Sequence, residues 1–186
     1  YKSHQKSGGG NHMPGTASLD GATLVAALRD VIKEFARHGA RQICLVNGHF
    51  ENSWFIIEAI DLALRELRWD GVTDVKIVVL SYWDFVGPEA LAQLYPNGFP
   101  GWELEHGGVL ETSLMLALHP ALVHLHAAVD VAPATFPPYD VYPVKPDWTP
   151  PSGTLSSPKE ASAEKGQILL QVCTAGIVKA LVAEFG

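Results

Sequence analysis

The chain has 186 residues, of which 47% are hydrophobic and 18% are charged, and its formal net charge is −7. This composition is typical of a folded globular protein, and the acidic balance argues against nucleic acid or an anionic membrane as a partner, because both attract basic patches. The length favours one domain, so we expect residues 1–186 to form a single domain with a sizeable core.

The chain begins at Tyr1 without a methionine, and its first dozen residues read like the middle of a domain. We therefore expect the domain to be truncated at its N-terminus. No pattern predicts a signal peptide, and no uninterrupted apolar run approaches the roughly 18–20 residues that span a bilayer. Cys44 and Cys173 lie in apolar patterns and are interpreted as buried, reduced thiols of a cytoplasmic protein rather than as a disulfide or a nucleophile.

Apolar periodicity predicts alternating helices and strands in the first half of the chain. A helix is expected from Asp20 to about residue 38, where Gly39 is a good stop signal. Two buried strands are expected on either side of a second helix, which gives a strand, a helix and a strand at 41–46, 52–68 and 75–80. Because the connections are short, the strands should be parallel with a right-handed crossover, which makes the fold class α/β.

The second half of the chain is predicted to be mainly helical. Three helices and one strand are expected there, with the helices near 88–95, 109–118 and 157–185 and the strand within 121–131. The last helix should have Pro158 at its first position, and its two glycines, Gly166 and Gly176, indicate close packing. The proline-rich stretch 132–153 is too long for an ordinary connector and reads as a working loop or an interface arm.

His49 and Glu51 follow the first buried strand, at the sheet edge where ligands gather in α/β proteins. Imidazole nitrogen and carboxylate oxygen suit a borderline divalent cation, so this pair is a candidate metal site and predicts a metal hydrolase. The alternative is a loop histidine bonded to a carbonyl and a glutamate stabilised at a helix N-terminus. A catalytic site typically needs three protein ligands, and no cluster in residues 13–186 obviously completes this one.

A second candidate cluster surrounds His106, which precedes a predicted helix and is followed by two glycines. Imidazole is the usual proton shuttle near neutral pH, and Glu111 could fix the orientation of its ring. We therefore predict catalytic roles for His106 and Glu111. The alternative is a solvated acidic loop.

Two tryptophans and a serine are candidates for substrate contacts. Trp83 follows the second predicted strand, and the alternative to a substrate contact is packing in the core, which is the commoner place for an aromatic side chain. Trp102 follows a flexible glycine and proline loop and could close over a flat ligand as a lid. Ser7, in a glycine-rich stretch, could approach a substrate or lie in a plain flexible loop.

Several segments carry a close resemblance to a known family. The resemblance covers nearly the whole chain, through Ser7-Gly-Gly-Gly-Asn-His, Pro14-Gly-Thr, Ser18-Leu-Asp-Gly-Ala-Thr23, Ala36-Arg-His-Gly-Ala-Arg41, Asn47-Gly-His-Phe-Glu-Asn52, Leu62-Ala-Leu-Arg-Glu-Leu67, Ser81-Tyr-Trp-Asp-Phe85, Glu105-His-Gly-Gly108, Glu111-Thr-Ser-Leu-Met-Leu116 and Ala134-Thr-Phe-Pro-Pro-Tyr-Asp140. On these segments the chain resembles the creatininase family of creatinine amidohydrolases.

The resemblance implies a three-layer α/β/α fold with a largely parallel central sheet and a site of two divalent metal ions, zinc, manganese or both. His49 and Glu51 would each ligate one metal, and the remaining ligands would come from an N-terminal part that precedes this sequence. Trp83 and Trp102 would line the substrate pocket, and His106 would carry the proton. Family members assemble as hexamers, so a homo-oligomer is expected.

Two departures from the family bear on the substrate. Phe50 stands where the family has tyrosine, and Glu103 stands where it has aspartate, and both positions are expected to contact substrate. The function that the resemblance implies is hydrolysis of a cyclic amide, creatinine to creatine and the reverse, by a hydroxide that bridges the metals. A related hydrolase of another small amide, and a truncated homologue without catalytic activity, remain as alternatives.

Overall fold

The computed structural model describes residues 16–139, 141–143, 145, 148 and 150–186. Ser7 therefore lies outside the described residues. The chain divides into two compact units, the first containing Ala17–Tyr82 and Ile177–Gly186 and the second containing Trp83–Gly176. Each unit is described by itself, and the expectation of a single domain stays a prediction.

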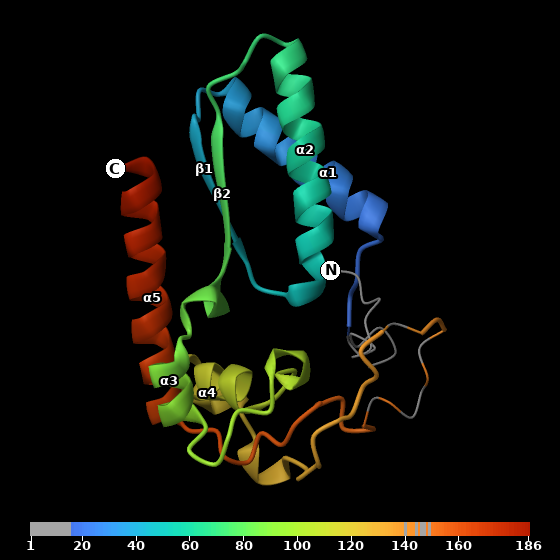
Figure 1. Cartoon of the computed structure of the whole chain (residues 1–186), viewed down its shortest axis with the longest axis vertical. Coiled ribbons are helices and arrows are strands. Elements are labelled where there is room, and N and C mark those ends of the chain that lie inside the picture. The colour runs from blue at the N-terminus through green and yellow to red at the C-terminus, as the bar shows by residue number, and fades with distance from the viewer. Residues whose placement is uncertain (1–15, 140, 144, 146–147, 149) are drawn as a thin grey trace. The chain divides into compact units, whose positions relative to one another are not determined.

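The first unit is built on two parallel strands, as the sequence predicts. Strand β1 (Gln42–Asn47) pairs with strand β2 (Lys76–Ser81) in parallel, with Gln42 opposite Lys76 and Asn47 opposite Ser81. Helix α1 (Gly21–Arg37) precedes the strands, and helix α2 (Ser53–Trp69) connects them (Figure 1). The α/β class and the parallel order are thus confirmed.

The core of the first unit lies between the strands and the helix pair. Its centre is a buried cluster with one side chain from α1, one from β1 and one from α2, namely Ile32, Ile43 and Ala63. Ile60 of α2 and Ile77 of β2 pack against this cluster. Alternate strand residues therefore face the helices, which is the period that a strand with one covered face requires.

Helices α1 and α2 are held together by close packing and by charge. A Cβ atom at Gly21 would lie 2.3 Å from Cε1 of Phe55, so only glycine allows the two helices to approach so closely at that point. Further along, Lys33 Nζ lies 2.6 Å from Glu66 Oε2. Helix α1 ends where predicted, since Gly39 has φ +96° and its N–H donates to the Ala36 carbonyl.

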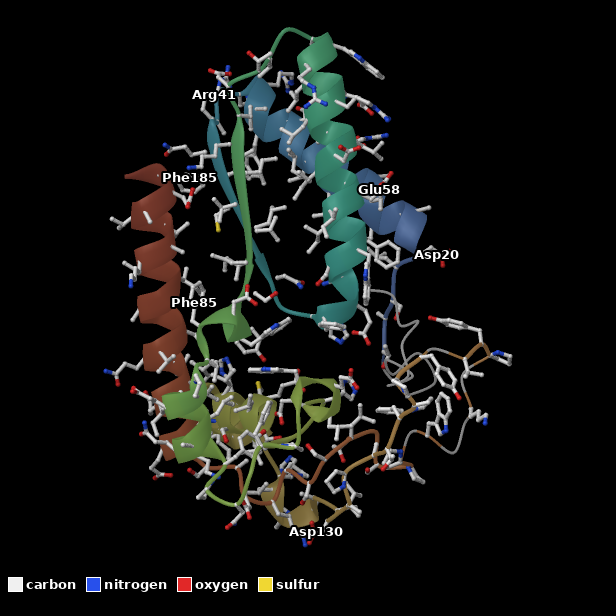
Figure 2. The ribbon with its side chains drawn as sticks, in the orientation of Figure 1. Asp20, Arg41, Glu58, Phe85, Asp130 and Phe185 are labelled. Atoms are coloured by element: carbon white, nitrogen blue, oxygen red, sulfur yellow. The ribbon has the colours of Figure 1, made fainter. Side chains whose placement is uncertain are left out.

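The last turns of helix α5 (Ala163–Phe185) contact the beginnings of both strands. Lys76 Nζ lies 2.6 Å from Glu184 Oε2 and donates to the Glu184 carbonyl, and Gln42 Nε2 donates to the carbonyl of Phe185. These turns lie beside the strands on the side away from α1 and α2 (Figures 1 and 2, with Phe185 labelled in Figure 2). Residues 177–185 of α5, the strands and the helix pair therefore form three layers.

The second unit contains helices α3 (Pro88–Leu94) and α4 (Val109–Leu118) and the first part of α5. The prediction of a strand within 121–131 is wrong, because this segment forms two short 3₁₀ turns, Pro120–Leu122 and Leu125–Ala127. The N–H groups of Leu122 and Ala127 donate to carbonyls three residues earlier. These local hydrogen bonds satisfy the backbone groups within the turns, whereas a strand would need a neighbouring strand to satisfy them.

Helix α5 begins later than the sequence predicts. The prediction that Pro158 occupies its first position is wrong, because a turn follows in which the Ala161 N–H donates to the Pro158 carbonyl, and the helix starts at Ala163. The reason is Ser162, whose hydroxyl accepts the N–H of Lys165, as a serine cap does at a helix N-terminus.

The two glycines of α5 mark close packing, as the sequence predicts. A Cβ atom at Gly166 would lie 2.0 Å from the Ser113 carbonyl oxygen of α4, and one at Gly176 would lie 2.2 Å from Cγ of Phe85. Phe85 is labelled beside α5 in Figure 2. Any larger residue at either position would push α5 away from its neighbours.

Helix α5 is also the one described helix that is long and apolar enough to cross a membrane, judged by length and composition only. The sequence analysis found no uninterrupted apolar run of that length. Helix α5 is consistent with this, because charged residues such as Glu164 and Lys179 interrupt its apolar sequence. Cys173 on α5 is buried and Cys44 on β1 is half-buried, and both are free thiols. Burial raises the pKa of both thiols, which does not favour a nucleophilic role.

Candidate active site

The turn after β1 is organised by the side chain of Asn47, which is 4% exposed. Its Oδ1 accepts the N–H of His49 at 3.1 Å and the Nδ2 of Asn52 at 3.3 Å. Its Nδ2 donates to Ser53 Oγ at the start of α2 and to Ser81 Oγ at the end of β2. One amide therefore connects both strand ends and the following helix, which fixes the backbone between them.

His49 and Glu51 lie on this fixed turn and point toward each other. His49 Nδ1 lies 2.6 Å from Glu51 Oε2, and Glu51 is 4% exposed, in a short 3₁₀ turn (Phe50–Asn52) just before α2. A buried carboxylate needs a cationic or hydrogen-bonding partner to offset its desolvation, and here the imidazole lies against it.

The pair fits a divalent cation in the chemistry of its donor atoms. One nitrogen and one buried carboxylate oxygen converge from a single turn, which is the mixed donor set that zinc and manganese accept. In the described residues, however, no group of three or more histidine, cysteine, aspartate or glutamate side chains could hold a metal ion. A complete site therefore needs donors in addition to His49 and Glu51.

Phe50, between these two residues, points outward. Its side chain is 57% exposed and its ring contacts Trp54 edge to face, with centroids 5.5 Å apart. Phe50 therefore presents an apolar ring on the outer side of this turn.

The second cluster is the loop that carries His106, at the start of α4. Two glutamates bind its backbone. Glu105 Oε1 accepts the N–H of Leu110 at 2.7 Å, and Glu111 Oε2 accepts the N–H of Gly107 at 2.6 Å. The structure therefore places Glu111 on the loop backbone next to His106, where it fixes the turn that holds the imidazole.

Burial shapes the electrostatics of this loop. Desolvation raises the pKa of the Glu105 carboxyl, although hydrogen bonds from Tyr95 and from the Leu110 N–H oppose the shift. Burial and the neighbouring Glu105 carboxylate raise the pKa of Tyr95. The phenol is therefore a proton donor to Glu105 throughout the physiological pH range, and the two groups share one hydrogen bond.

Trp102 begins a 3₁₀ turn (Trp102–Leu104) and is 44% exposed, as expected for a residue outside the core. Its ring contacts Phe99 edge to face at 5.0 Å, and Phe99 in turn contacts Tyr95 at 5.0 Å. Glu103 beside it is exposed, and Trp83, in the 3₁₀ turn Tyr82–Phe85 after β2, is half-buried.

The structure thus brings the predicted residues together in two groups. His49, Phe50 and Glu51 share one turn of the first unit. Trp83 and the residues of the His106 loop belong to the second unit, with Trp102, Glu103 and Glu111. Sequence reasoning missed the organising side chains Asn47 and Tyr95. The Asn47-Gly48 turn signal pointed to the first, but no local pattern pointed to Tyr95.

The fold and the first group of residues define an α/β protein with a candidate metal-hydrolase site at the carboxyl end of a parallel strand. Residues 2–181 match the family model described as creatininase, creatinine amidohydrolase. A creatinine amidohydrolase from Pseudomonas putida is 66% identical over 186 residues, which is 100% of this chain and 72% of that protein. The chain therefore belongs to the creatininase family.

Solved structures agree with this assignment. A manganese creatininase is 66% identical and superimposes with a TM-score of 0.95, covering 100% of this chain and 72% of the other. A creatininase point mutant in complex with creatine is 65% identical with a TM-score of 0.95, covering 100% of this chain and 73% of the other. A further mutant of the Zn-Zn type gives the same TM-score of 0.95. The creatininase-like fold that the sequence predicts is thus confirmed.

Proposed function

We propose that this protein is a metal-dependent hydrolase that opens the cyclic amide of creatinine to give creatine and also catalyses the reverse reaction. The observation that carries the proposal is the convergence of His49 Nδ1 and the buried Glu51 carboxylate, 2.6 Å apart, at the end of β1. Membership of the creatininase family, with 66% identity to a creatinine amidohydrolase over the whole chain, supports the reaction and the substrate.

His49 and Glu51 would help to hold two divalent cations, zinc, manganese or both. The names of the related structures, which include Zn-Zn and manganese forms, support this choice. When bound, such cations lower the pKa of water and polarise a carbonyl oxygen. The contribution of the chain is to hold a nitrogen and an oxygen donor rigidly, because the turn between β1 and α2 is bonded through Asn47.

His106 would donate a proton to the ring nitrogen that leaves when the lactam opens. An imidazole can both donate and accept near neutral pH, which a reversible reaction requires. Glu111 supports this role indirectly, because its bond to the Gly107 N–H limits how far the loop can move. A fixed loop reduces the number of orientations that the imidazole must sample before proton transfer.

Trp83 and Trp102 would lie against the flat substrate ring and exclude water from it. The 44% exposure of Trp102 supports this role, because an indole left half-exposed has area available for a ligand. Ser7 and Glu103 would supply polar contacts, and Phe50 would form an apolar wall. These roles follow from the resemblance to the family.

One alternative is supported by a specific observation. Phe50 and Glu103 differ from the family pattern, and Phe50 is exposed on the surface of its turn. A lost hydroxyl and a longer carboxylate change the polar contacts available to a substrate, so hydrolysis of another small amide is the second candidate function.

The proposal is tested by metal analysis together with turnover. The protein is loaded with zinc or manganese, its metal content is measured, and hydrolysis is followed for creatinine and for a panel of other small cyclic amides. We expect bound metal and the highest kcat/KM with creatinine. A higher value with another amide would select the alternative, and loaded protein without activity on any amide would make it a non-catalytic homologue.

We also propose that the protein is a cytoplasmic homo-oligomer, with six subunits as in the family. Free thiols at Cys44 and Cys173 support a reducing compartment, and exposed apolar residues on α5, such as Val178 and Val182, support an association surface. Light scattering of the purified protein in solution measures the number of subunits directly.

A further inference from the structure

Tyr95 connects two residues of the proposed site that the sequence presents as separate. It is 7% exposed and follows the last residue of α3. Its hydroxyl donates to Glu105 Oε2, next to His106, and its ring packs on Phe99, which packs on Trp102. One side chain therefore supports both the proton-carrying loop and the indole that would cover the substrate.

The Glu105 carboxylate uses both oxygens to hold the His106 loop. Oε2 accepts the Tyr95 hydroxyl, and Oε1 accepts the N–H of Leu110 at 2.7 Å and that of Glu111 at 3.4 Å. These N–H groups belong to the first turn of α4, where no backbone acceptor is available within the helix. The side chain of Glu105, which directly precedes His106, is thus bonded to the first turn of α4, which follows His106. These bonds hold the two ends of the loop together.

The backbone around His106 is also held from outside the loop. The Leu155 N–H donates to the His106 carbonyl at 3.0 Å, and Leu155 is completely buried. At Gly108, a Cβ atom would lie 2.6 Å from Glu105 Oε2, so glycine is needed for the carboxylate to lie against the chain. The Glu105 carboxylate and the loop backbone are therefore closely packed around His106.

From these contacts we infer that Tyr95 and Glu105 form a positioning pair, which orients the His106 imidazole through the loop and the Trp102 indole through Phe99. Neither residue is proposed to touch the substrate. The inference rests on the proposed function, because it assigns the pair to the step in which His106 transfers a proton.

Tyr95 acts on the loop through its hydroxyl, which donates to Glu105, and on Trp102 through its ring, which packs on Phe99. The two effects can therefore be tested separately. Tyr95→Phe removes the hydroxyl that bonds Glu105 and keeps the ring that packs on Phe99. We expect kcat to fall about tenfold and KM for creatinine to stay within about twofold. Tyr95→Leu removes the ring as well, so we expect it to raise KM in addition, because Trp102 loses its support.

Two measurements distinguish positioning from a general loss of stability. In protein labelled with ¹⁵N-histidine, the His106 signals, identified by their absence in His106→Ala, should shift in Tyr95→Phe. In Tyr95→Phe/His106→Ala, turnover should equal that of His106→Ala alone, because the hydroxyl acts through the imidazole. Thr73→Val, which removes a hydroxyl from an exposed residue in the connection between α2 and β2, is the control and should behave as wild type.

Glu105 gives an independent test in which rescue is expected. Glu105→Ala removes both bonds and should lower kcat at least as much as Tyr95→Phe. Glu105→Gln keeps an oxygen for the Leu110 N–H and a polar group for the Tyr95 hydroxyl, so it should recover most of that loss.

The inference is wrong if Tyr95→Phe leaves kcat and the His106 signals unchanged, or if the losses in Tyr95→Phe and His106→Ala multiply in the double variant. Failure of the proposed function has a different signature. Wild-type protein would then lack creatinine turnover, while the His106 signals would still shift in Tyr95→Phe, which would support the pair on its own.

Discussion

The two groups of site residues use carboxylates in opposite ways. On the turn after β1, the Glu51 carboxylate faces the imidazole of His49, and the backbone is held by a neutral amide, that of Asn47. On the loop before α4, the Glu105 and Glu111 carboxylates are bonded to backbone N–H groups. In the first group the carboxylate lies beside an imidazole, whereas in the second the carboxylates hold the loop backbone.

This difference shows that a glutamate near a histidine has no fixed meaning in a sequence. Glu51 and Glu111 both lie within a few residues of a histidine, and both were predicted to serve the chemistry. Their contacts separate them, because Glu51 Oε2 lies 2.6 Å from His49 Nδ1, whereas Glu111 Oε2 accepts the backbone N–H of Gly107.

The comparison is tested most strongly at Glu51. In Glu51→Gln, the amide keeps the size of the side chain but removes its charge, so bound metal should be lost and kcat should fall about a thousandfold. Metal analysis and turnover measure both effects. Glu111→Gln is the matched control, and retained metal is expected there. Loss of metal in Glu111→Gln but not in Glu51→Gln would reverse the comparison.

The next largest effect is expected at His106. His106→Ala should lower kcat about a hundredfold and leave bound metal nearly unchanged, because the imidazole moves a proton and does not hold the cations. Metal content and turnover measured on the same sample provide the check. Turnover equal to wild type would remove His106 from the proposed reaction.

Gly108→Ala tests whether the loop is as tightly packed as its contacts imply. The added Cβ would lie 2.6 Å from both Glu105 Oε2 and Ser156 Oγ, so we expect a loss of about 1–3 kcal/mol in the free energy of unfolding. Gly87→Ala, at a position with nothing within 4 Å, is the control and should change stability much less. Denaturant unfolding measures both, and equal effects would contradict tight packing at Gly108.

The smallest expected effect concerns pH. Because burial raises the pKa of Glu105 in the folded state, the unfolded chain loses this proton first as the pH rises above 4.5, the ordinary pKa of a glutamate. The folded state then binds more protons than the unfolded state, so the contribution of Glu105 to stability falls as the pH rises through this window.

Glu105→Gln removes this titration, so the melting temperature of wild type relative to the variant should decrease as the pH rises above 4.5. Thermal melts across that range give the difference directly, and other groups cancel because both proteins contain them. A difference that increases with pH would mean that the carboxylate is stabilised in its charged form.

Much of the fold follows from local patterns. The apolar periods of α1, β1, α2 and β2 predict these elements to within a residue or two, because each buries one face against the same core. The segment 121–131 misled the prediction, since its apolar residues look like a strand but close into turns after Pro120. The start of α5 depends on the cap at Ser162, which competes with the proline signal.

In the candidate site, too, local contacts could be predicted from the sequence and non-local contacts could not. The contact between His49 and Glu51 is local, so spacing predicts it. Tyr95 and Glu105 are ten residues apart, and their contact depends on how the intervening loop turns at Gly98 and Gly101, which have φ near +110°. A sequence gives no direct signal for such a contact, and the structure is needed to find it.

The hydrogen bonds of Asn47 also bear on how the protein ages chemically. An asparagine followed by glycine is the pair most prone to deamidation, in which the next backbone nitrogen attacks the side-chain carbonyl. In this fold the Asn47 amide is bonded at both its oxygen and its nitrogen, to the backbone of His49 and to Ser53 among others. The attack requires these hydrogen bonds to break. The rate of deamidation at Asn47 is therefore set by how often the end of β1 unfolds locally.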